Sequence, residues 1–159
     1  MKKYTKLVKS FLKDLGYDYV KVRNSPDMCA DIENEKIFIN SEWYKPIGAL
    51  EKASYKAVKK LYKEYGWKIK VSMGTFAILH ELGHVVSKPL YKDLDSELNA
   101  YTHKSIKILQ KRLGMYEEMK AYRKIRLERD ADRIAYKIYK DNKDIVIKYD
   151  KQLKELMGQ

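Results

Sequence analysis

The chain has 159 residues, 45% of them hydrophobic, and its 34 Lys and Arg against 22 Asp and Glu give a formal net charge of +12. A chain of this length can bury one hydrophobic core without disulfides, and its single cysteine cannot form an internal one. No apolar run approaches the roughly 20 residues that cross a bilayer, and the N-terminal segment lacks the continuous apolar stretch of a signal peptide. These features predict one domain over residues 1–159, in a reducing cytoplasm and without a membrane span.

The positive charge is compatible with nucleic acid, an anionic membrane face or an acidic protein as partner. The lysines are spread along the whole chain, and no zinc finger, helix-turn-helix or aromatic RNA-binding motif occurs. A solvated lysine-rich surface is the simpler interpretation. Nucleic acid stays open as a partner, without support from a motif.

Hydrophobic periodicity predicts the elements of the N-terminal part of the chain. Apolar residues at helical spacing predict an amphipathic helix over residues 4–15, and β-forming runs with turn residues between them predict a small sheet within residues 17–44. A second amphipathic helix is expected from about residue 47 to 65. Residues 67–71 are expected to form a short strand or the approach to the next helix.

The rest of the chain is predicted to be helical. Residues 72–86 are so strongly apolar that few positions face solvent, which predicts a buried central helix. A further helix is expected to begin with Asp95 or Ser96 as its cap. A long helix is then expected over residues 115–142, and apolar residues at helical spacing predict a last one over residues 143–156.

The predicted central helix contains the sequence His80-Glu81-Leu82-Gly83-His84, which has the H-E-x-x-H pattern. Four residues are about one helical turn, so both imidazoles project from one face and can bind one Zn²⁺, while Glu81 can reach a metal-bound water. The carboxylate can take the water's proton as the oxygen attacks a peptide carbonyl, and pass it to the leaving amine. Burying these polar groups on an apolar helix is costly without a ligand, and Gly83 lets another element approach closely.

A catalytic zinc takes three protein ligands and leaves a fourth position to water. His103 is a candidate by residue type, but it lies among polar neighbours. Glu128 and Asp132 form an i, i+4 pair on one helix face, so Glu128 could bind the metal while Asp132 accepts a hydrogen bond from a ligand histidine. An exposed charged turn paired with the neighbouring arginines is the alternative for this pair. Glu97, near the start of a predicted helix, is the rival ligand.

The two patterns together, His80-Glu81-Leu82-Gly83-His84 and Glu128-x-x-Ala131-Asp132, resemble the zinc metallopeptidases of the gluzincin group. The short chain favours the ImmA/IrrE-like or phage-encoded members. The resemblance covers residues 72–86 and 122–139. The spacing between the two patterns is longer than in the most compact members, and no helix-turn-helix or sensor domain is appended.

The resemblance implies an α+β zincin-like fold with a small N-terminal sheet, a helix-rich remainder and a buried active-site helix. It implies that His80, His84 and Glu128 bind zinc, that Glu81 is the general base and that Asp132 orients a ligand histidine. It also implies an edge strand beside the cleft, where an extended substrate can add main-chain hydrogen bonds, and residues 36–40 are expected to form it.

The sequence therefore predicts a zinc-dependent metallopeptidase of the bacterial cytoplasm or a phage, which hydrolyses peptide bonds in a protein or peptide substrate by Glu-assisted attack of zinc-bound water. Five residues could stabilise the oxyanion: His103, Tyr101, Tyr122, Arg126 and Arg133. Cys29 could be a fourth zinc ligand, although a lone buried thiol is the simpler interpretation. The alternatives are a basic nucleic-acid- or repressor-binding accessory protein with structural or no zinc, and a catalytically idle protein that keeps the metal as a folding element.

Overall fold

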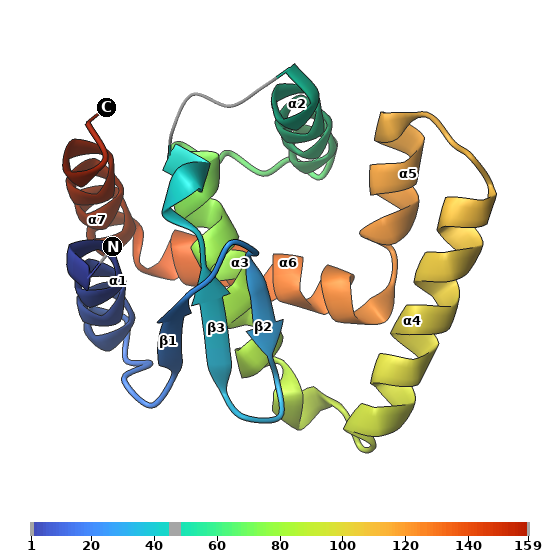
Figure 1. The fold of residues 1–159 in the computed structure, drawn as a ribbon, viewed down its shortest axis with the longest axis horizontal. Helices are drawn as coiled ribbons and strands as arrows, with labels where there is room; N and C mark the ends of the chain where they lie inside the picture. Colours follow the sequence, from blue (N-terminus) through green and yellow to red (C-terminus); the bar gives the residue numbers. More distant parts are fainter. Residues whose placement is uncertain (1, 45–48, 159) are drawn as a thin grey trace.

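The computed structural model describes residues 2–44 and 49–158, and this part of the chain forms a small sheet and seven α-helices (Figure 1). The strands are β1 (Lys21–Asn24), β2 (Cys29–Asp31) and β3 (Lys36–Ile39). The helices are α1 (Lys2–Asp14), α2 (Ala49–Glu64), α3 (Met73–Val86), α4 (Leu94–Gln110), α5 (Met115–Tyr122), α6 (Arg126–Asp141) and α7 (Lys143–Leu156). The predicted mixed α+β architecture, with an N-terminal sheet and a helix-rich remainder, is confirmed. None of the described helices is both long and apolar enough to cross a bilayer.

The sheet has the strand order β1-β3-β2, with β1 parallel and β2 antiparallel to β3. The expectation that residues 36–40 form an edge strand is therefore wrong, because β3 occupies the middle. The reason lies in burial: Ile37 and Ile39 are fully buried in the core, whereas each residue of β2 is partly or largely exposed. A strand whose alternate side chains are all buried is favoured at the centre, and β2 takes the edge.

Helix α3 is the centre of the molecule. It packs against β2 and β3 and most extensively against α6, and almost its whole length is buried. Ser72 caps its first turn, because the side-chain oxygen accepts the backbone N–H of Thr75 at 3.2 Å. This confirms the buried central helix. Residues 67–71 form no strand, so they are the approach to α3, and Trp67 stacks on Tyr136 of α6.

The long helix predicted over residues 115–142 is two helices, α5 and α6. The break at residues 123–125 carries neither proline nor glycine, so the sequence gives no local signal for it. Its cause is tertiary: Ile125 is buried, and α5 turns away from the line of α6 to pack against α2 (Figure 1).

Two further boundaries differ from expectation. Helix α4 begins after Asp93, whose carboxylate accepts the backbone N–H of Ser96 at 3.1 Å, so neither Asp95 nor Ser96 is the cap. Helix α2 is present from Ala49, and residues 47 and 48 of its predicted range lie outside the described residues. Helices α1 and α7 lie side by side at one end of the molecule, and α4 and α5 lie together at the other (Figure 1).

Candidate metal centre

The candidate site forms where α3 and α6 cross. The two backbones meet at Gly83 and Ala131: a Cβ on Gly83 would overlap the Ala131 carbonyl oxygen and lie 3.0 Å from its carbonyl carbon. Any side chain at position 83 would force the helices apart. The glycine inside the H-E-x-x-H pattern therefore permits the close crossing predicted for it, and this crossing brings residues of α6 beside both imidazoles.

His80, His84 and Glu128 come together at this crossing as a buried cluster that could hold a metal ion, with one donor atom from each residue within 4.8 Å of the others. The Nε2 atom of His80 lies 3.1 Å from Oε2 of Glu128, and Nε2 of His84 lies 3.4 Å from Oε1. Donors bound at 2.0–2.1 Å to one tetrahedral ion lie about 3.3 Å apart. Two imidazole nitrogens and a carboxylate at these separations fit a zinc-type ion.

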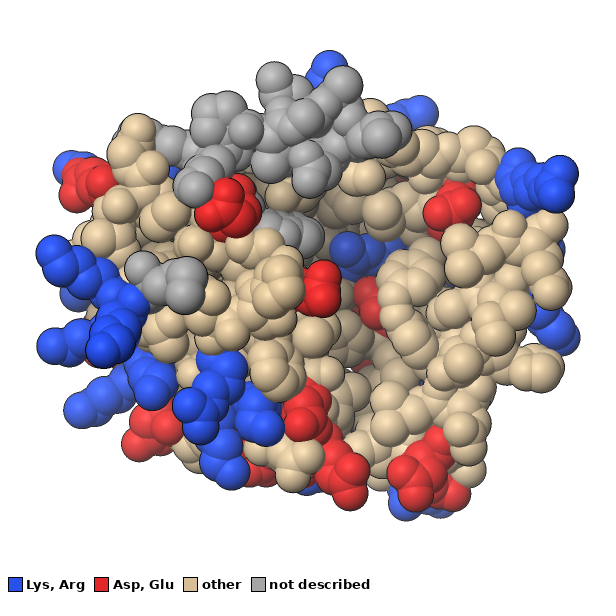
Figure 2. All heavy atoms as spheres, in the orientation of Figure 1, with Lys and Arg blue, Asp and Glu red and all other residues tan. Residues whose placement is uncertain are grey.

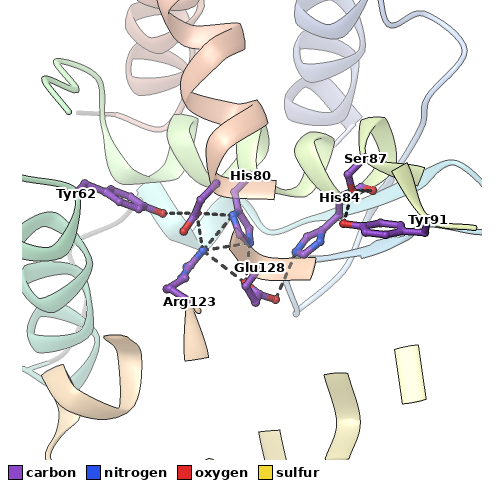
Figure 3. Close-up of polar contacts among 8 residues, drawn as sticks. Tyr62, His80, His84, Ser87, Tyr91, Arg123 and Glu128 are labelled. Atoms are coloured by element: carbon purple, nitrogen blue, oxygen red, sulfur yellow. Dashed lines mark hydrogen bonds and ion pairs between the residues drawn. The ribbon is translucent and has the colours of Figure 1, made fainter. Parts of the chain in front are cut away.

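The ring of His80 is held by a hydrogen-bond network (Figure 3). Its Nδ1–H donates to Oδ1 of Asp132 at 2.8 Å, and the same oxygen accepts the Tyr62 hydroxyl at 2.7 Å and Nη1 of Arg123 at 2.8 Å. A carboxylate behind a ligand histidine fixes its tautomer and directs Nε2 toward a metal. In this structure Nε2 of His80 also lies 3.2 Å from Nη1 of Arg123. The second imidazole differs, because Nδ1 of His84 is buried without a hydrogen-bond partner.

The charges around the cluster favour a cation. Burial and the Arg123 charge act to lower the pKa of His80, but its hydrogen bonds to Asp132 and Glu128 outweigh them and raise it to about 9. Burial opposes the ionisation of Glu128, yet hydrogen bonds to His80 and His84 hold its pKa well below the ordinary value. The pKa of Asp132 is lowered in the same way, chiefly by Arg123 and His80, against the effect of burial. Both carboxylates are therefore ionised at neutral pH.

Glu81 lines the cavity in front of the cluster and takes no part in the hydrogen-bond network behind it. Burial raises the pKa of its carboxyl group, and the two neighbouring histidines only partly offset this effect. A general base works best when its pKa lies near the working pH, so this environment suits a carboxylate that accepts and returns a proton.

The cluster opens into a cavity of about 470 Å³, and Figure 2 shows this face of the molecule hollowed near its centre. The edge strand β2 lines it with Cys29 and Ala30, and helices α2 to α6 supply most of the other walls. Most of the lining is apolar. The strand beside the cleft is thus β2, in place of the segment that the sequence suggested.

Of the other candidates for zinc binding and for stabilising the oxyanion, only some lie at the cavity. Tyr101 and Tyr122 line the cavity, and burial together with the Glu128 carboxylate raises the pKa of Tyr101. His103 is exposed and lines none of it. Glu97, the rival ligand, lies outside the cluster and forms an ion pair with Arg126. Neither residue lines the cavity that holds the cluster.

Cys29 and Arg133 are also not placed as expected. Cys29 is exposed, so the expectation of a buried thiol is wrong, and it is no member of the metal cluster. Arg133 is exposed and lines a different cavity from the one that holds Glu81.

Four side chains that shape the site were not predicted from the sequence, namely Tyr62, Ser87, Tyr91 and Arg123. Tyr62 and Arg123 hold Asp132, and no motif marks either, because the contacts join α2, the α5–α6 break and α6. At the end of α3, the Ser87 hydroxyl donates to the carbonyl of His84 at 2.8 Å and accepts the Tyr91 hydroxyl at 3.2 Å. These contacts fix the turn of helix that carries the second imidazole.

Comparison with protein-family models, curated protein sequences and solved structures gave no match. The interpretation of the site therefore rests on its own geometry and chemistry.

Proposed function

We propose that this protein is a zinc-dependent metallopeptidase that hydrolyses peptide bonds in a protein or peptide substrate. One observation carries the proposal: the buried donors His80, His84 and Glu128 meet at one point, and Glu81 borders the same cavity. Two histidines and a glutamate are a donor set of catalytic zinc, which leaves a position open beside the base. The gluzincin-like, zincin-like character of the fold is part of this proposal.

Zinc in such a site supplies Lewis acidity, which polarises a carbonyl group and lowers the pKa of water toward 7. The residues of the chain perform the proton transfers. Glu81 accepts a proton from the water that attacks the peptide carbonyl carbon, and it returns the proton to the amine nitrogen as the carbon–nitrogen bond breaks. Asp132 keeps the proton of His80 on Nδ1, and Tyr101 is the hydroxyl that we assign to the carbonyl oxygen as negative charge develops there.

The position of β2 supports a peptide as substrate. In the described part of the chain β2 pairs with β3 along one side only, and its residues Cys29 and Ala30 line the cavity. An extended chain can pair with the main chain of such an edge strand, with its alternate side chains entering the apolar parts of the cavity. In this proposal the scissile bond lies beside Glu81, which borders the same cavity.

The decisive experiment compares Glu81→Gln with wild type for zinc content and for hydrolysis of unfolded protein and of a peptide mixture. We expect the variant to keep one zinc per chain and to lose at least about 100-fold in hydrolysis rate, because only the proton transfer is removed. Glu97→Gln, which neutralises a carboxylate on α4 outside the cluster, is the matched control and should leave both measurements unchanged.

Equal hydrolysis by Glu81→Gln and wild type would contradict the proposal. A wild-type protein that binds zinc without hydrolysing any peptide, and that unfolds on chelation, would be the catalytically idle alternative. Binding of nucleic acid by a protein without bound zinc would favour the accessory-protein alternative.

A further inference from the structure

A second cavity, of about 570 Å³, is lined in part by Asp132 and Arg123, both of which contact the ring of His80. Four cationic side chains line it, namely Arg123, Lys124, Arg129 and Arg133, against a single carboxylate. That carboxylate, Asp132, already accepts hydrogen bonds from three groups through one oxygen. We call this space the basic cavity.

The cations of the basic cavity are poorly neutralised. Arg129 contacts the Asp130 carboxylate at 3.2 Å, but Lys124 and Arg133 have no ion-pair partner in the described part of the chain. Arg129 and Arg133 are one helical turn apart on α6, where like charges repel one another. An anion between them would relieve this repulsion.

Arg123 connects the two cavities, because it is the one described residue that lines both. Its side chain is only 15% exposed, and every contact that it makes to Asp132, His80 and Glu128 comes from Nη1. Its Nε is buried and has no hydrogen-bond partner. A guanidinium group has five N–H donors in a fork suited to phosphate, so Arg123 keeps donors that its present contacts do not use.

We propose that the basic cavity binds a phosphate group, and that the bound anion strengthens metal binding through Arg123. Nη1 of Arg123 lies 3.6 Å from Oε2 of Glu128, so its positive charge opposes a dication in the cluster. An anion in the basic cavity offsets that charge.

Two sources of the phosphate group are chemically possible: free phosphate and a nucleotide. Tyr65, which borders the cavity and is 43% exposed, is the aromatic side chain on which a base would stack. Free phosphate would be bound by the cationic side chains alone and would not need Tyr65.

The test begins with calorimetric titration of metal-free protein with inorganic phosphate, against sodium chloride at equal ionic strength. We expect saturable binding of one phosphate per chain, weakened at least about fivefold in Arg133→Gln, since charge-assisted hydrogen bonds are lost. Lys140→Gln removes the same charge from an exposed site elsewhere on α6 and is the matched control, expected to bind as wild type does. A binding heat that sodium chloride reproduces at equal ionic strength would overturn the phosphate site. Equal weakening of phosphate binding in Arg133→Gln and Lys140→Gln would overturn it as well.

The nucleotide arm uses AMP and adenosine on the same protein. AMP that binds more tightly than phosphate, and returns to the affinity of phosphate in Tyr65→Ala, would identify a nucleotide. Equal affinities of AMP and phosphate would identify the free anion. Either result supports the site.

The link to the metal is measured by zinc competition with a chelator that holds free zinc at nanomolar levels, with and without phosphate. We expect phosphate to tighten zinc binding about fivefold or more, and Arg133→Gln to need at least about fivefold more phosphate for the same effect. Phosphate that binds without changing zinc affinity would overturn the coupling. None of these measurements needs peptidase activity, so their failure is distinguishable from failure of the proposed function.

Discussion

At the scale of single residues, Asp132 is the side chain on which the geometry of the candidate centre depends. One of its oxygens accepts hydrogen bonds from Tyr62, His80 and Arg123, which come from three separate segments of the chain. The carboxylate is nearly fully buried, so these contacts replace part of the hydration that burial has removed, while the buried Oδ2 has no hydrogen-bond partner among the described residues. Asp132 therefore orients the first imidazole and ties α2 and the α5–α6 break to the metal cluster.

Replacing Asp132 with Asn should weaken zinc binding by about 10- to 100-fold, because the ligand histidine loses its charged acceptor. The measurement is a competition titration with a chelator of known zinc affinity. Asp141→Asn is the matched control on the same helix, since the exposed Asp141 pairs with Lys137 and not with the histidines. An Asp132→Asn protein with wild-type zinc affinity would show that the orientation of His80 does not depend on this carboxylate.

At the scale of elements, α3 is held at both ends, which fixes the two imidazoles relative to the rest of the molecule. The buried Asp150 carboxylate of α7 accepts the backbone N–H of Ser72 at 3.0 Å and the hydroxyl of Thr75 at 2.7 Å, and it pairs with Lys154 at 2.7 Å. The start of α3 is thus bound to α7, while Ser87 fixes its end. Rigid support of this kind keeps metal ligands within reach of one ion.

The Asp150 contacts predict a pH-dependent contribution to stability. Burial acts to raise the pKa of Asp150, but Lys154, Ser72 and Thr75 outweigh it and lower the pKa below the ordinary value. The stabilisation is therefore complete above the unfolded pKa of about 3.9 and is lost as the pH falls through the lower folded pKa.

We expect Asp150→Asn to lower the free energy of unfolding by about 1–3 kcal/mol at pH 7, and the difference from wild type to shrink below about pH 4. Urea unfolding from pH 3 to 7 measures both effects. Asp144→Asn, at an exposed position on α7, should cost less than about 1 kcal/mol at pH 7. A difference from wild type that stays constant down to pH 3 would contradict the assigned role of the carboxylate.

At the scale of the whole molecule, the main hydrophobic core and the metal cluster occupy different places. The core gathers side chains of α1, the sheet, α2, α3, α6 and α7, and none of the three metal-cluster residues belongs to it. The core therefore does not need a metal to bury its apolar surface. A metal in the cluster would add to stability by joining α3 to α6.

Zinc should raise the free energy of unfolding by about 4 kcal/mol when it is present at 1,000 times its dissociation constant, and a chelator should reverse the gain without unfolding the protein. Urea unfolding with zinc and with chelator measures the difference. His84→Ala should unfold identically in both conditions. Complete unfolding on chelation would instead indicate that the native fold needs the metal.

Much of the candidate site was predictable because its determinants are local. The spacing of His80 and His84 within one helix fixes both imidazoles on one face, whatever the rest of the chain does. The same rule pairs Glu128 with Asp132 on α6. Amphipathic periodicity likewise predicted most helices, and the glycine at position 83 indicated a close approach by another element.

Other features depended on contacts between distant segments. Three strands of three or four residues carry too little pattern to define their order. The central place of β3 goes with the full burial of Ile37 and Ile39, which depends on packing by distant segments. The break before α6 follows from the packing of Ile125 and of α5 on α2, and it is this break that brings Arg123 to Asp132. The sequence by itself determined which side chains share a helix face, because helix geometry is local; only the tertiary structure decided which faces meet, because that depends on long-range packing.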